Sequence, residues 1–95
     1  MEFVREEHAG NGVIRAFEAG QEIGEITYQY RGEGRILVDY TGVSTSHRNR
    51  GLGKKLVDEA IAFAREQGLK IVPLCSFARI VMERDPSAAD VLVRS

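Results

Sequence analysis

The sequence lacks the features of disulfide scaffolds and membrane proteins. Cys75 is the only cysteine, so no disulfide can form within the chain, which suits a reducing compartment. No hydrophobic run approaches the roughly 18 residues that a membrane span requires. Residues 1–7 are charged and do not resemble a signal peptide. We therefore expect a cytoplasmic globular protein that does not bind membranes.

Tryptophan is absent, and neither sign of charge dominates. The chain has 13 basic and 14 acidic residues and a net charge of −1, so no global field favours nucleic acid. Any anion site must therefore be local. One candidate is the stretch 47–55, which contains four bases and no acid: Arg48, Arg50, Lys54 and Lys55. We predict no metal site.

The 95 residues fit one domain, 1–95, whose first half reads as an antiparallel meander. Asn11-Gly12 is a hairpin turn signal, and glycines also separate the later strands. The predicted strands are residues 3–8, 13–18, 21–31 and 35–43. In the last strand, strict alternation assigns Ile36, Val38 and Tyr40 to one face and Leu37, Asp39, Thr41 and Val43 to the other.

The second half changes to helical periodicity. Residues 51–67 carry an apolar stripe at helical spacing, and Gly68 suits a helix end. A short strand at 69–74 follows, in which Pro73 favours an edge position or a bulge. A helix at 76–84 follows it, and residues 88–95 stay unassigned. The order β-β-β-β-α-β-α predicts a mixed α/β (α+β) sheet with one parallel crossover.

The turn before the long helix has the composition of a phosphate cradle. Free amides and the positive end of the helix dipole meet there, and the glycines of Gly51-Leu52-Gly53 let an anion approach the backbone. The alternative is an ordinary helix start with solvated bases. The P-loop pattern is absent, and position 56 is Leu rather than the glycine of a dinucleotide-binding turn.

These residues resemble the Gcn5-related N-acetyltransferase (GNAT) superfamily. Its motif Arg/Gln-x-x-Gly-x-Gly/Ala is matched by Arg48, Gly51 and Gly53. More narrowly, residues 39–43 and 69–77 resemble the minimal acetyltransferase-like proteins of the YjdJ type. The resemblance implies a GNAT-like sheet and acetyl-coenzyme A (acetyl-CoA) as the cofactor. The family often has two further strands at the carboxyl end, so we expect a truncated version here.

The resemblance also implies a binding mode. Backbone amides of residues 49–54 would hold the diphosphate, the edge of 41–43 would pair with the pantetheine arm, and an N–H near Thr41 would polarise the acetyl carbonyl. The implied cofactor-binding residues are Thr41, Val43, Arg48, Asn49, Arg50, Gly51, Leu52, Gly53 and Lys54. Many family members carry a Tyr acid on the last helix, where this chain has Met82.

Cys75 and Tyr40 are the candidate catalytic residues. Cys75 precedes a helix, where a thiol can have a lowered pKa, and it is either a nucleophile, acetyl carrier or acid, or a small core residue. Tyr40 is either a proton donor to a leaving thiolate or a half-buried strand aromatic. Asp39 and Glu25 are weighed as general bases against ordinary surface carboxylates. His47 either contacts phosphate or is exposed to solvent.

Two functions from different classes follow. The first is an N-acetyltransferase that transfers an acetyl group from acetyl-CoA to an amine of unknown identity. The alternative is a non-catalytic acyl-CoA-binding module or regulator. A weaker third interpretation is an interaction domain whose glycine turn binds another anion. We expect a monomer or weak dimer.

Overall fold

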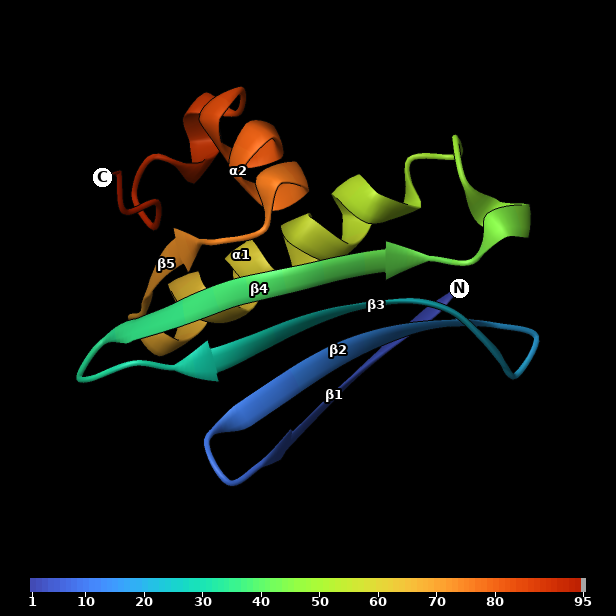
Figure 1. Cartoon of the computed structure of the whole chain (residues 1–95), viewed down its shortest axis with the longest axis horizontal. Coiled ribbons are helices and arrows are strands. Elements are labelled where there is room, and N and C mark those ends of the chain that lie inside the picture. Colours follow the sequence, from blue (N-terminus) through green and yellow to red (C-terminus); the bar gives the residue numbers. More distant parts are fainter. Residues whose placement is uncertain (95) are drawn as a thin grey trace.

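The chain folds into a five-stranded sheet with its helices on one side (Figure 1). The computed structural model describes residues 1–94. The strands are β1 (Glu2–His8), β2 (Asn11–Glu18), β3 (Gln21–Tyr30), β4 (Arg35–Val43) and β5 (Lys70–Pro73), and the helices are α1 (Leu52–Gln67) and α2 (Ser76–Glu83). Short 3-10 turns cover Thr45–His47 and Pro86–Ala88. None of the described helices has the length and apolar character to cross a bilayer.

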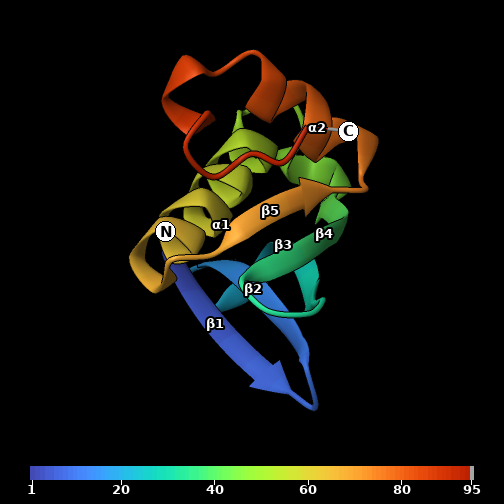
Figure 2. The same ribbon diagram turned by 90° about the vertical axis from the view of Figure 1, so that its left-hand side faces the viewer.

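The sheet is mixed, as the element order predicts. Its strands lie in the order β1-β2-β3-β4-β5; the first three pairings are antiparallel, and β4 and β5 are parallel. Figure 2 shows α1 along one face of the sheet and α2 beside α1, near the β4–β5 edge. Within residues 1–94 the opposite face of β1–β4 carries no helix. The predicted fold class is confirmed.

Helix α1 covers the sheet with its apolar stripe. Its buried residues are Leu52, Leu56, Val57, Ala60, Ile61 and Ala64. They pack in one cluster with Ile14, Ile26 and Ile36 of the strands and with Met82 of α2. Burying each large aliphatic side chain contributes roughly 1.5–3 kcal/mol. Gly68 ends the helix in the left-handed conformation, with a φ of 70°, as its position in the sequence predicts.

The predicted alternation of β4 is wrong at its carboxyl end because of a β-bulge. Thr27 pairs with Tyr40 but Tyr28 pairs with Val38, so Asp39 is an extra residue in β4. The bulge exchanges the two faces beyond it. Val43 packs against the core, whereas Tyr40 turns to the face without helices and is 52% exposed. Tyr40 therefore does not share a face with Val38.

Part of the unassigned tail adds to the outer edge of β5. Ile71 donates its N–H to Val91 O at 2.6 Å, and Val93 N donates to Ile71 O at 2.8 Å. The side chain of Val91 is buried in the core cluster. The edge position predicted for the Pro73 strand is confirmed, because β5 is the last strand of the sheet. The tail nevertheless pairs with part of its outer edge, through a bridge between Ile71 and Leu92. Ser95 lies outside the described residues.

A substitution at Gly12 would test how tightly β2 and β3 pack. A Cβ at Gly12 would lie 2.1 Å from the ring of Tyr28, which is itself almost fully buried. We expect Gly12→Ala to lower the free energy of unfolding by about 1–3 kcal/mol in urea denaturation, because the ring must move. In a Tyr28→Leu background, where the ring is gone, the same substitution should have a much smaller effect. An equal loss in both backgrounds would contradict this contact as the cause.

Candidate functional site

The site begins where β4 and β5 separate. Only Arg35–Val38 of β4 pairs with β5, and the amides of Leu74 and Cys75 then both donate to Val38 O, at 2.9 and 3.0 Å. The chain turns there into α2. Among the described residues, the last part of β4 has a strand partner on the β3 side only.

A cleft of about 770 Å³ occupies this separation. Its walls are the end of β4, the turn that follows, the first turn of α1, and Phe77 and Val81 of α2. Eleven residues were predicted to bind cofactor or to act in catalysis, and the cleft is lined by nine of them: Tyr40, Thr41, Val43, Arg48, Asn49, Gly51, Leu52, Gly53 and Lys54. Arg50 and Cys75 do not line it.

The start of α1 has the electrostatics of an anion site. No side chain caps it, and its first turn holds no acidic residue. Lys55 N donates to Gly51 O at 3.1 Å, which begins the helical hydrogen bonding, so the amides of 51–54 precede it without intrahelical acceptors. Arg48 and Lys54 stand at the positive end of the helix dipole, where a cation is unfavourable; Lys54 is paired there with Asp58 at 2.9 Å, whereas Arg48 forms no ion pair within residues 1–94.

Each glycine of the turn also has a structural reason of its own. Gly51 has a φ of 75°, a left-handed conformation that other residues adopt only with strain. A Cβ on Gly53 would lie 2.8 Å from the ring of Phe77, so this glycine lets α2 approach α1. An anion site is therefore supported by the free amides and the bases, and the glycines alone do not require one.

Side-chain contacts hold the turn in place. His47 Nδ1 lies 2.8 Å from Ser44 Oγ, and His47 Nε2 lies 3.3 Å from the Glu18 carboxylate at the end of β2. The side chain of His47 is only 18% exposed, so the solvent-exposed position expected from the sequence is wrong. Arg48 Nε donates to Val43 O at 3.3 Å, which ties the turn to the end of β4. The turn is thus held by side-chain contacts from three segments of the chain.

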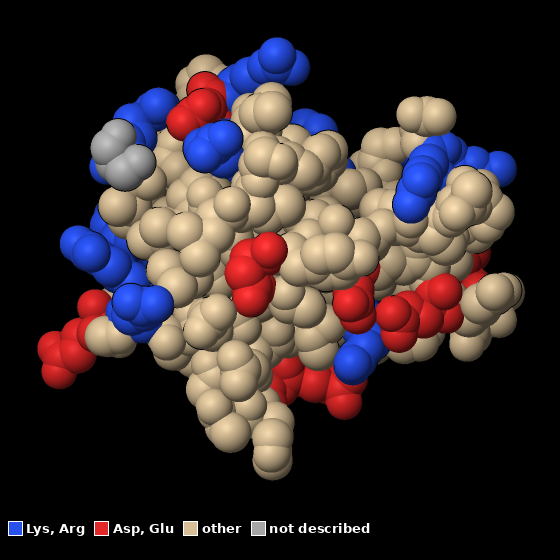
Figure 3. Space-filling view, viewed as in Figure 1, with Lys and Arg blue, Asp and Glu red and all other residues tan. Residues whose placement is uncertain are grey.

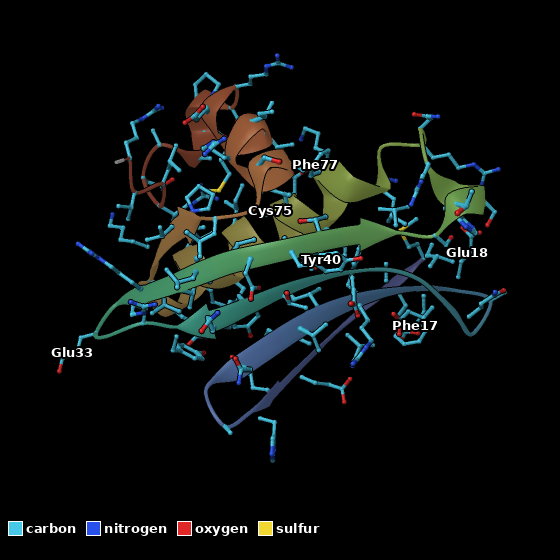
Figure 4. All side chains as sticks on the ribbon, in the orientation of Figure 1. Phe17, Glu18, Glu33, Tyr40, Cys75 and Phe77 are labelled. Atoms are coloured by element: carbon cyan, nitrogen blue, oxygen red, sulfur yellow. The ribbon has the colours of Figure 1, made fainter. Side chains whose placement is uncertain are left out.

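Cys75 lies behind the cleft wall, at the N-cap of α2 (Figure 4). Its Sγ is 3.7 Å from Thr41 Oγ1, and Thr41 lines the cleft. Burial alone would raise the pKa of the Cys75 thiol, but hydrogen bonds from the backbone of Ala78, the side chain of Thr41 and the backbone of Phe77 outweigh it. The pKa is therefore lower than that of an ordinary cysteine, so the thiol ionises more readily.

Tyr40 lies on the opposite wall, and its ring runs over Gly42. A Cβ at Gly42 would be 2.3 Å from the Tyr40 hydroxyl oxygen, so Gly42 leaves the space that the ring occupies. Phe77 and Val81 line the cleft but were not assigned to the site from the sequence. The helical pattern of 76–84 predicted the helix and not its orientation, so no sequence signal assigned these two side chains to the cleft.

Comparison with known proteins agrees with this geometry. The model of the GCN5-related N-acetyl-transferase family matches residues 11–91, nearly the whole chain. No curated protein matches. A GCN5-like protein from Staphylococcus aureus, solved by NMR, is 34% identical with a TM-score of 0.71, covering 97% of this chain and 89% of that one. The chain therefore belongs to the GCN5-related N-acetyltransferase family.

More distant structures share the fold. A ribosomal-protein-alanine N-acetyltransferase from Brucella melitensis is 22% identical, with a TM-score of 0.68 over 79% of this chain and 62% of that one. A Bacillus anthracis protein assigned as a streptothricin acetyltransferase, solved with acetyl-CoA, is 23% identical, with a TM-score of 0.59 over 67% of this chain and 37% of that one. The chain thus spans less than two thirds of these two longer relatives.

The pH dependence of Cys75 alkylation tests the environment of the thiol. Because the folded-state pKa is lowered, we expect iodoacetamide to react with an apparent pKa below that of a cysteine in an unfolded peptide. Thr41→Val should move the profile to higher pH, since a stabilising hydrogen bond is lost. Thr45→Val, on the exposed turn, should leave it unchanged. A wild-type profile equal to that of the unfolded protein would contradict the assignment.

Proposed function

We propose that the chain binds acetyl-CoA in the cleft and transfers the acetyl group to an amine. The observation that carries this proposal is that the free amides at the start of α1 and the unpaired edge of β4 meet in one cleft. The free amides suit a diphosphate, and the unpaired strand edge suits an extended chain that carries amide groups. Family membership supports the same assignment.

The residues present fit the parts of acetyl-CoA. The amides of residues 51–54 would hold the diphosphate, with Arg48 and Lys54 adding charge. The edge of β4 at Thr41–Val43 would pair with the pantetheine arm, and an N–H near Thr41 would polarise the acetyl carbonyl. Phe77 and Val81 supply an apolar wall. Arg50 would contribute through its amide, because its side chain does not line the cleft.

Tyr40 and Cys75 are the groups that we propose for the chemistry. The Tyr40 hydroxyl would donate a proton to the sulfur that leaves when the amine attacks the thioester. Cys75, with its lowered pKa, would act beside Thr41 as a nucleophile that carries the acetyl group between donor and amine. The two routes, direct transfer and transfer through Cys75, differ in whether an acetyl-cysteine forms.

A non-catalytic acyl-CoA-binding module is the second candidate. One observation favours it: Met82, at the position where many family members have a Tyr acid, is 1% exposed and belongs to the core. Helix α2 therefore supplies no proton donor at that position. Turnover would then depend on the residues of β4 and on Cys75.

Cofactor binding is tested by substituting two arginines, Arg48, which lines the cleft, and Arg50, which does not. We expect Arg48→Ala to weaken acetyl-CoA binding by about tenfold or more in calorimetry, since a charge-assisted contact is lost. Arg50→Ala, a charge-matched control outside the cleft, should have a clearly smaller effect. In wild type, acetyl-CoA should shift the amide NMR signals of residues 49–54. Unmoved signals at saturation would refute the site.

Catalysis is tested by thiol release with a panel of amines. Tyr40→Phe should lower kcat by about 10²-fold or more without weakening acetyl-CoA binding, because general acid catalysis is lost. Cys75→Ala should abolish turnover if the acetyl group passes through the thiol, and mass spectrometry of wild type should then show an acetylated Cys75. No turnover by wild type with any amine, together with tight binding, would instead establish the binding module.

A further inference from the structure

His47 lines the cleft, and the proposed function gives it no role. It ends the 3-10 turn Thr45–His47 between β4 and α1, directly before Arg48, which lines the cleft as well. Its side chain is 18% exposed, so most of the ring is covered by protein and a part stays open. Histidine is the side chain that changes its charge between about pH 5 and 8. The proposed anion site therefore has a titratable group in its wall.

Both ring nitrogens of His47 have partners that suit either protonation state. Nδ1 lies 2.8 Å from Ser44 Oγ and 3.0 Å from Ser46 Oγ, and a hydroxyl can donate a hydrogen bond or accept one. Nε2 lies 3.3 Å from a carboxylate oxygen of Glu18, which accepts an N–H from the neutral ring and from the charged ring alike. The ring can therefore gain or lose a proton at Nδ1 without leaving its place.

The strands beside the turn supply the negative charge that faces His47. Glu18, at the end of β2, favours the imidazolium, and Figure 4 shows it at the end of the molecule where the turn lies. From β3, Ile23 O accepts the amide of Ser44, and the neighbouring acid Glu22 is already ion-paired with Arg15 at 3.2 Å. Glu18 is thus the acid in direct contact with the ring.

The cleft supplies charge of the opposite sign. Among the described residues, its other titratable side chains are those of Tyr40 from β4, Arg48 from the turn and Lys54 from α1. Lys54 is paired with Asp58, whereas the charge of Arg48 has no such partner within residues 1–94 and disfavours an imidazolium beside it. Figure 3 shows Lys and Arg side chains on the right, over this turn, and Asp and Glu side chains below them.

A bound anion would change this balance. A diphosphate on the amides of residues 51–54 would offset the charge of Arg48 and add negative charge to the cleft that His47 lines. The imidazolium is then more favourable with ligand than without it. Because such coupling is reciprocal, a ligand that favours the proton binds more tightly when the proton is present. Affinity should therefore rise as the pH falls through the range in which histidine titrates.

We propose that His47 is a proton-linked contact of the anion site, so that a diphosphate ligand binds together with a proton on Nδ1 and leaves more readily as the pH rises. The inference rests on the proposed function and adds regulation by pH to it. Glu18 is the positioning residue, which holds the ring through Nε2 and supplies its counter-charge. The proton comes from solvent and returns to solvent when the ligand leaves, and only an N–H bond forms and breaks.

The test uses dephospho-coenzyme A, because the 3′-phosphate of coenzyme A is a monoester with its own ionisation near pH 6. Calorimetry at about pH 6.5, in two buffers of different ionisation enthalpy, should show that a fraction of a proton is taken up for each ligand bound. The affinity should be about fivefold higher at pH 5.5 than at pH 8, as expected for one partly exposed charge pair. Long-range proton–nitrogen NMR of wild type should show the His47 ring moving toward the imidazolium when ligand is added.

Three variants separate the charge of the ring from its packing. His47→Gln keeps a hydrogen-bonding side chain but cannot titrate, so the proton uptake should disappear and the affinity should become nearly independent of pH. His8→Gln is the matched control, because His8 ends β1 and does not line the cleft, and it should keep the uptake of wild type. Glu18→Gln should move the rise in affinity to lower pH, since the imidazolium loses its counter-charge, a change that a purely structural role would not produce.

Two results would overturn the proposal and leave the cofactor site intact. The first is that dephospho-coenzyme A binds without proton uptake and leaves the ring signals of His47 unmoved at saturation. The second is that His47→Gln takes up as much of a proton as His8→Gln does. Failure of dephospho-coenzyme A and acetyl-CoA to bind at any pH would count against the proposed function instead.

Discussion

The site depends on one carbonyl oxygen, Val38 O, which accepts hydrogen bonds from the amides of both Leu74 and Cys75. This shared acceptor ends the β4–β5 ladder and directs the chain into α2. A buried strand edge normally has to be paired, because unpaired backbone groups are costly away from water. Here the end of β4 instead faces a cleft, where its edge can bind a ligand. The β4–β5 pair is therefore hydrogen-bonded at Arg35–Val38 and open to the cleft at the carboxyl end of β4.

The bulge at Asp39 decides what that opening contains. Strict alternation would have placed Tyr40 beside Val38 in the core and turned Val43 away from it. The extra residue reverses both positions: Val43 packs against the core, and Tyr40 turns to the face without helices, where it lines the cleft. Gly42 completes the arrangement, because any side chain there would displace the tyrosine ring. A backbone irregularity therefore places Tyr40 at the wall of the cleft.

Helical periodicity and local turn chemistry were enough to predict α1, its end at Gly68 and the glycine turn at its start. They depend on neighbours within a few residues, which a single sequence displays. The bulge, the partial burial of His47 and the position of Phe77 were not predictable in this way. Each is set by a partner far along the chain: β3 for Asp39, Glu18 for His47 and Gly53 for Phe77. Tertiary contacts, and not local preference, fix them.

The same distant contacts hold the turn of the proposed anion site in one conformation. Arg48, tied to Val43 O, and His47, held between Ser44 and Glu18, fix the turn from two sides without using the amides of α1. A flexible turn would have to be ordered when the ligand binds, and that loss of conformational entropy would weaken affinity. Because the turn is joined to β2 and β4, its conformational entropy is lost when the protein folds and not when a ligand binds. The hairpin end at Glu18, although it does not line the cleft, therefore helps to order the proposed site.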